Sequence, residues 1–170
     1  ERGSLIRVYL NVQRDYIRNR IAIVSGRVTA SNYNGKALTF GSMMTKKGVE
    51  SDEKAQAEDE RRILKESLSD LFESIKLVAE LSGNKEKAPV HLYFYTQNER
   101  DALMDGVKRH PGICEADAVR DLLGLRAGVD QPMVSIVKNE VNRRMAKKTI
   151  SDGVLAIMDR FYPRGDVKMN

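Results

Sequence analysis

The sequence predicts an α/β domain with a mixed β-sheet, and three observations lead to that expectation. Three strand-like segments come first and are separated by short polar turns. A long segment with helical periodicity follows, and after it one more strand is followed by a helix. The chain has 170 residues, of which 41% are hydrophobic, and this is enough for one core. We therefore expect a single domain over residues 1–170.

The three N-terminal segments have the composition of β-strands. Residues 5–12 and 20–30 are rich in β-branched and aromatic side chains and lack the polar spacing of an amphipathic helix. Residues 37–43 form a shorter candidate that follows a turn signal at residues 32–35. Because the connections are short, we expect the three strands to form an antiparallel meander.

A long helix and a fourth strand follow the meander. Residues 54–82 have apolar side chains at intervals of three and four, which predicts an amphipathic helix that covers one face of the sheet. Residues 90–95 come after Pro89 and are almost continuously apolar or aromatic, as in a central parallel strand. A right-handed crossover through the long helix would place this strand beside the first one and parallel to it.

The remaining residues have a helical pattern. Thr96 and Glu99 fit a capping box, which predicts a helix that begins there and runs to about Arg109. Residues 115–170 are expected to be a helical part of the same domain, with helices at 116–125, 132–146 and 150–161. A fifth strand is hard to find in this pattern, unless residues 112–114 begin one.

Composition excludes several classes of protein. Cys114 is the only cysteine, so the chain has neither an internal disulfide nor a zinc site built from several cysteines. There is no apolar run of about 20 residues and no signal-peptide pattern at the N-terminus, so we expect a cytoplasmic protein without a membrane partner. The net charge of +5 permits contact with phosphate groups without requiring it.

The predicted order of elements, strand, strand, strand, helix, strand and helix, is the opening order of the ribonuclease H-like fold. The chain also resembles the predicted RecB-family nucleases, whose ribonuclease H-like domain is related to the DEDD exonucleases and is found beside superfamily 1 helicase modules. The resemblance is carried by four short segments, namely residues 8–16, 89–95, 98–103 and 121–126. It implies a piece of a larger helicase-nuclease protein of DNA repair or defence, with additional C-terminal helices on the βββαβα core.

The resemblance also implies a metal site whose first two ligands are altered. Nucleases of this fold bind two Mg²⁺ or Mn²⁺ ions through carboxylates, and the first pair stands at positions i and i+2 of the first strand. Here that place is occupied by Asn11 and Gln13, which keep hydrogen-bonding capacity but carry no charge. The resemblance implies that Glu99 and Asp121 are the remaining acidic positions. We therefore expect a degenerate metal site, at which the Asn11 and Glu99 side chains approach one another. Whether the chain is an enzyme stays open.

Two other interpretations remain open at this point. Asp15 would share a face with Asn11 and Gln13 if the first strand continued that far, and an active 3'–5' exonuclease could then use Asp15, Glu99 and Asp121. Against this, the charged and polar run from Arg14 to Arg20 suits a hairpin turn better than a strand. Glu99 also suits a helix cap, and Asp121 also suits a solvated charge in a first helical turn. The third interpretation is a non-catalytic domain that binds a protein partner.

The C-terminal third carries the best electrostatic candidate for nucleic-acid binding. Arg143 and Arg144 lie about one helical turn from Lys147 and Lys148, which is a spacing suited to successive phosphate groups. The expected partners are therefore DNA, either single-stranded or at a duplex end, and the other domains of a larger polypeptide.

Overall fold

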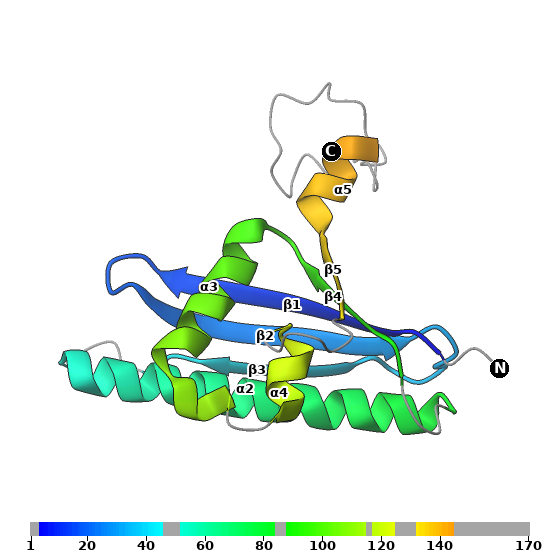
Figure 1. Ribbon diagram of the computed structural model, residues 1–170, viewed down its shortest axis with the longest axis horizontal. Coiled ribbons are helices and arrows are strands. Elements are labelled where there is room, and N and C mark those ends of the chain that lie inside the picture. The colour runs from blue at the N-terminus through cyan, green and yellow to red at the C-terminus, as the bar shows by residue number, and fades with distance from the viewer. Residues whose placement is uncertain (1–3, 46–51, 84–87, 115–116, 125–131, 145–170) are drawn as a thin grey trace, which may run out of the picture.

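The computed structural model describes residues 4–45, 52–83, 88–114, 117–124 and 132–144 (Figure 1). Its strands are β1 (Ile6–Asp15), β2 (Arg20–Ala30), β3 (Leu38–Met43), β4 (Val90–Phe94) and β5 (Met133–Ile136). Its helices are α2 (Glu53–Leu81), α3 (Gln97–Arg109), the 3₁₀ helix η1 (Pro111–Cys114), α4 (Asp117–Leu122) and α5 (Val137–Arg144).

The strands form one five-stranded mixed sheet with the order β3-β2-β1-β4-β5. Strands β1, β2 and β3 pair in antiparallel fashion, which confirms the predicted meander. Strand β4 lies beside β1 and runs parallel to it, with Ile6 opposite Val90 and Leu10 opposite Phe94, as the crossover through α2 predicted. Strand β5 is parallel to β4 and completes the described sheet at the other edge.

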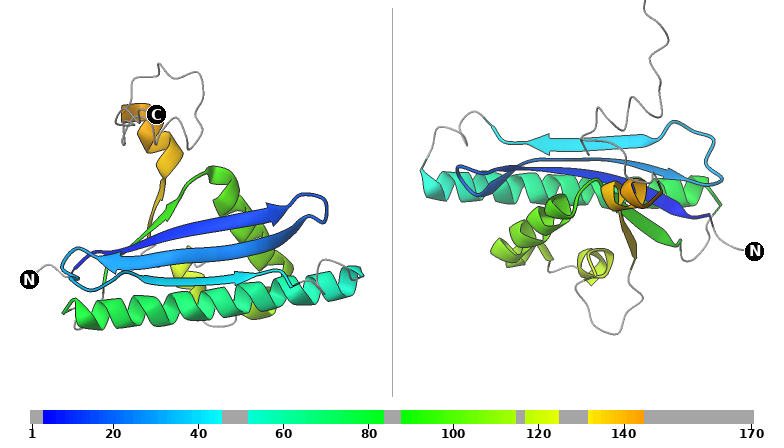
Figure 2. Two further views of the ribbon diagram at one scale, coloured as in Figure 1. Left: turned by 180° about the vertical axis from the view of Figure 1, so that it is seen from behind. Right: turned by 90° about the horizontal axis from the view of Figure 1, so that it is seen from above.

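The two faces of the sheet differ in what covers them. Along β1, the side chains of Ile6, Val8, Leu10 and Val12 are buried, whereas those of Tyr9, Asn11 and Gln13 are exposed. Helices α2 and α3 both pack on the buried side, which we call the covered face, and Figure 2 shows them on the same side of the strands. The opposite side, which we call the open face, retains large exposed side chains on three strands, namely Tyr9, Met43 and Met133.

Helix α2 confirms the long amphipathic helix expected at residues 54–82. Asp52 caps its first turn by accepting a hydrogen bond from the backbone N–H of Ala55 at 2.9 Å. The helix ends at Leu81 with Ser82 as its C-cap, and Gly83 follows with a φ angle of +79° that suits a residue without a side chain. Its buried apolar side chains are Ile63, Leu64, Leu68, Leu71 and Val78.

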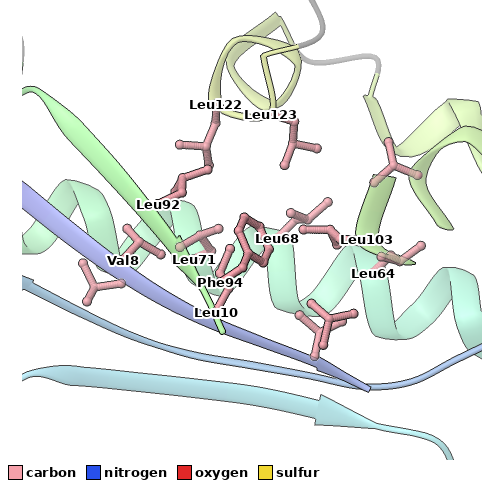
Figure 3. Packing of buried hydrophobic residues seen from close by; sticks show 14 of the residues in the cluster. Val8, Leu10, Leu64, Leu68, Leu71, Leu92, Phe94, Leu103, Leu122 and Leu123 are labelled. Atoms are coloured by element: carbon pink, nitrogen blue, oxygen red, sulfur yellow. The ribbon is translucent and has the colours of Figure 1, made fainter. Parts of the chain in front are cut away.

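The core lies between the covered face and the helices, where side chains of β1, β4, α2, α3 and the end of α4 meet (Figure 3). Helix α3 approaches the sheet closely at Gly106, because a Cβ atom there would overlap the Cδ1 atom of Ile21 on β2. Leu122 and Leu123 contribute from the α4 end and are each 7% exposed. The short region after α3 is therefore part of the same core as the meander.

Two expectations about the C-terminal part were wrong. Residues 132–146 are not one helix, because Met133–Ile136 is a strand and the helix begins only at Val137. The fifth strand is not at residues 112–114, which belong to the 3₁₀ helix η1. A strand of four residues is too short to produce a periodic signal, and its hydrogen-bonding partner β4 lies far away in the sequence. The helix expected at residues 150–161 lies outside the described residues.

Candidate functional site

Glu99 lies at the start of α3, and its carboxylate is bonded to that helix end. Its Oε2 accepts a hydrogen bond from the backbone N–H of Thr96 at 2.9 Å, and the Thr96 hydroxyl accepts one from the N–H of Glu99 at 3.4 Å. This is the predicted capping box. The carboxylate therefore has a structural role in the first turn of α3.

A cavity of about 560 Å³ opens beside this helix end, and Val12, Arg14, Glu99 and Asp101 line it. Val12 and Arg14 are the β1 residues that alternate with Asn11 and Gln13, so they project to the other side of the strand. The Nε atom of Arg14 is buried and has no hydrogen-bond partner among the described residues. Glu99 thus shares its cavity with a guanidinium group.

The structure does not bring Asn11 and Gln13 to Glu99. Both amide side chains lie on the open face, where Asn11 Nδ2 donates to Ser25 Oγ at 3.4 Å, while Glu99 lies against the other side of β1. The reason is the two-residue period of a strand, which puts Asn11 and Val12 on opposite faces. The expected approach of Asn11 to Glu99 was therefore wrong, and these two residues do not mark one metal site.

Asp15 stands at the turn between β1 and β2. Strand β1 does continue to Asp15, but its pairing with β2 shifts register between Gln13 and Arg14. The Asp15 carboxylate accepts hydrogen bonds from the backbone N–H of Ile17 at 2.9 Å and from the Arg18 side chain. The Arg18 side chain lowers the pKa of Asp15 from its ordinary value, so this carboxylate is occupied by the turn.

Asp121 lies in α4, directly before Leu122 and Leu123 of the core. Within the described ranges, no three His, Cys, Asp or Glu side chains are placed so that they could hold one metal ion. Asp15, Glu99 and Asp121 all belong to those ranges, and the structure does not assemble them into such a group. Their roles as ligands stay predictions.

The predicted basic residues lie mostly beyond the described part. Arg143 and Arg144 are the last two residues of α5, whereas Lys147 and Lys148 lie outside the described residues. Their role in binding DNA stays a prediction.

A buried ionic cluster around Glu60 was missed by the sequence interpretation. Glu60 is 0% exposed, and its carboxylate accepts hydrogen bonds from four groups on β2 and at the end of α3. These donors are Arg20 Nη1 at 3.2 Å, the Ile21 backbone N–H at 2.8 Å, Arg109 Nη2 at 2.6 Å and His110 Nε2 at 2.9 Å. The cluster ties α2, β2 and α3 together.

Hydrogen bonding keeps Glu60 ionised inside the protein. Burial by itself raises the pKa of this carboxyl group, but the bonds from Arg109, Ile21 and His110 outweigh burial and lower the pKa to about 2. A signal for this role was present in the sequence, because Glu60 precedes Ile63 and Leu64 by three and four residues and so lies on the apolar stripe of α2.

The open face carries a column of stacked aromatic rings. Tyr9 of β1 stacks on Tyr93 of β4 with ring centroids 4.9 Å apart and planes 18° apart. Tyr93 stacks in turn on His91, at 4.1 Å and 21°. The His91 ring is held by hydrogen bonds to the Tyr93 hydroxyl at 3.0 Å and to Ser135 Oγ at 2.9 Å. Burial lowers the pKa of His91, and Arg7 lowers it further, which favours the neutral ring.

The described part of the open face contains one carboxylate, that of Asp15 at the end of β1, and Arg18 forms an ion pair with it. Before the register shift between Gln13 and Arg14, strand pairing and alternation place 15 other residues on it. They are Arg7, Tyr9, Asn11, Gln13, Ile23, Ser25, Arg27, Thr29, Thr39, Gly41, Met43, His91, Tyr93, Met133 and Ser135. This face is therefore basic, aromatic and rich in neutral hydrogen-bonding groups.

Comparison with known proteins adds no identification. No protein-family model matches the chain, and no curated protein matches its sequence. Among the described helices, none combines the length and the apolar character needed to cross a lipid bilayer.

Proposed function

We propose that this chain is a ribonuclease H-like domain that binds DNA without hydrolysing it, within a larger helicase-nuclease type protein of DNA repair or defence. The fold part of the proposal is supported by the sheet order β3-β2-β1-β4-β5, in which an antiparallel meander is followed by two parallel strands. The biological context rests on the resemblance to predicted RecB-family nucleases.

The observation that carries the binding role is the chemistry of the open face. Arginine side chains, stacked aromatic rings and neutral polar groups are the side-chain types that contact phosphates and bases of nucleic acids. Arg7 and Arg27 supply the positive charge, and Tyr9 and Tyr93 supply the rings. The one carboxylate among the described residues of this face, Asp15, is paired with Arg18, so its repulsion of phosphate is small.

We expect no hydrolysis because of the charges near the end of β1, which do not favour a divalent ion. The two neutral amides Asn11 and Gln13 offer a divalent ion less attraction than carboxylates, because they do not offset the cost of its dehydration. On the other side of the strand, the Arg14 guanidinium lines the cavity of Glu99 and Asp101 and offsets part of their attraction for a cation.

Binding and hydrolysis are tested together with labelled single-stranded and duplex DNA. Fluorescence anisotropy should give dissociation constants of about 10⁻⁴–10⁻⁶ M near physiological salt that weaken as salt rises. No cleavage is expected in Mg²⁺ or Mn²⁺. Absence of binding to either DNA at low salt would overturn the proposal. So would cleavage by a nuclease-free preparation that Glu99→Ala or Asp121→Ala abolishes, which would favour the exonuclease interpretation.

A second experiment addresses the origin of the two amides. The variant Asn11→Asp with Gln13→Glu places two carboxylates side by side on the open face, and calorimetry should show tighter Mn²⁺ binding than in the wild type. Asn11→Asp alone is the matched control, because one carboxylate holds such an ion weakly. Equal affinity in the double variant and the wild type would mean that these positions never stood in for metal ligands.

A further inference from the structure

The aromatic column on the open face ends in a groove beside Tyr9. Tyr93 covers one face of the Tyr9 ring from β4, while the strand on the other side of Tyr9 is β2, with Arg27 directly opposite. A shallow groove of about 400 Å³ lies on that side, and its lining includes Tyr9, Asn11, Ser25, Arg27 and Thr39. The column of rings thus continues into an open space of the sheet surface.

We propose that this groove receives one unpaired base of single-stranded DNA, stacked on Tyr9 and continuing the column formed with Tyr93 and His91. The inference rests on the proposed function and names the form of DNA and the residues that contact it. A planar base over the groove would contact the Tyr9 ring, and the long, exposed Arg27 side chain would have to turn aside to cover the other face of the base. Both aromatic rings and guanidinium planes stack on bases.

The column is held in place before any ligand arrives. Tyr93 and His91 are hydrogen-bonded to each other at 3.0 Å, and His91 is bonded to Ser135 on β5 at 2.9 Å. The Tyr9 ring stacks on Tyr93 of this hydrogen-bonded pair, and Tyr9 is 41% exposed. Binding a base therefore costs little ordering of the rings, which leaves more of the stacking free energy for affinity.

The polar groups of the groove suit the edge of a base and its phosphates. The Asn11 amide lies beside Ser25 and has both donor and acceptor atoms, which is the chemistry used to contact base edges. Arg7 and Arg27 flank Tyr9 on the same face and provide positive charge for the backbone on either side of the base. In a duplex, base faces are covered by their neighbours, so this arrangement favours a single strand.

The test uses the full chain and a single-stranded oligonucleotide that contains 2-aminopurine, whose fluorescence is quenched by stacking. The wild type should quench the probe and bind it more tightly than a duplex of the same sequence. Tyr9→Ala should weaken binding about tenfold or more and remove the quenching, while Tyr9→Phe should retain both, because its ring still stacks. Tyr16→Ala, in the β1–β2 turn at 79% exposure, is the matched control and should leave the affinity unchanged.

A second pair of variants does not depend on removing a ring. Thr39→Glu places a negative charge in the groove and should weaken binding at low salt, while Thr39→Gln should not. Arg27→Ala should lower the slope of log affinity against log salt by about 1, and Arg61→Ala, on the exposed side of α2, should not.

The outcomes separate this inference from the proposed function. If the wild type binds DNA but Tyr9→Ala and Thr39→Glu bind as tightly, the groove is not the site, although the domain still binds DNA. Equal binding of duplex and single strand without quenching also overturns the inference alone. Failure to bind either form of DNA overturns both proposals. Circular dichroism of each variant confirms that a loss of binding is not a loss of folding.

Discussion

The covered and open faces of the sheet are built from the same strands, but they differ in how their polar side chains are bonded. On the covered face, the Glu60 carboxylate, which alone is fully buried among those of the described residues, accepts hydrogen bonds from four donors. On the open face, Tyr9, Asn11 and Arg27 are exposed around a groove. The buried cluster around Glu60 is thus committed to the fold, whereas Tyr9, Asn11 and Arg27 on the open face remain accessible to a ligand.

This difference separates stability from binding. Removing a group from the covered face leaves a cavity or an unpaired charge, which is costly. Removing a group from the open face exposes little new surface, because water already reaches it. The following predictions probe that contrast in order of decreasing expected effect.

Glu60→Ala should have the largest effect on stability. It leaves Arg20, Arg109 and His110 without their shared partner, and breaking a buried ion pair in this way costs about 3–5 kcal/mol. Urea denaturation measures the free energy of unfolding. The matched control is Glu58→Ala on the same helix, where the side chain is exposed and the change should be below about 0.5 kcal/mol. A loss of less than about 1 kcal/mol for Glu60→Ala would contradict the role of the cluster.

The pH dependence of stability should follow from the same carboxylate. Its pKa is about 2 in the folded protein, below the ordinary value of 4.5, so its stabilising contribution is present above about pH 4.5 and is lost as the pH falls toward 2. The contribution is about 3 kcal/mol. Denaturation of wild type and Glu60→Gln between pH 7 and pH 2 measures it. The difference between the two proteins should shrink in acid, and a constant difference would argue against the lowered pKa.

Gly106→Ala should destabilise the covered face through overpacking. The new methyl group meets the Cδ1 atom of Ile21, and relieving such an overlap costs about 1–3 kcal/mol. The higher helix propensity of alanine offsets up to about 1 kcal/mol of this. Thermal unfolding should therefore show a lower midpoint than the wild type. Lys108→Ala, at an exposed position of α3, is the control, and an unchanged midpoint in Gly106→Ala would mean that α3 approaches β2 less closely.

Asn11→Ala should have the smallest effect on stability, despite its central place in β1. Its side-chain bond to Ser25 is 3.4 Å long and exposed, so the free energy of unfolding should change by less than about 0.5 kcal/mol. Urea denaturation beside Val12→Ala, the buried neighbour on the other face, makes the contrast direct. A loss as large as that of Val12→Ala would show that the open face is part of the folding core.

Much of the fold was predictable from local patterns. The β-branched and aromatic composition of the first strand, the three-and-four spacing in α2 and the Thr96–Glu99 capping box are each visible within a short window, and each was confirmed. Strand β5 was not predictable in this way, because four residues carry no periodic signal and their hydrogen bonds go to β4. The parallel position of β4 followed from handedness and not from any single residue.

The sequence alone identified the residue types available for function. They are the neutral pair Asn11 and Gln13, the acidic Glu99 and the basic residues of the surface. Which of them meet depends on the pairing of strands and the packing of helices, and this put Arg14 and not Asn11 into the cavity of Glu99. The same packing joined Glu60 to Arg109 and Tyr9 to Tyr93, across 49 residues in the first case. Contacts at such separations are selected by the burial of the whole core, so a local pattern carries no information about them.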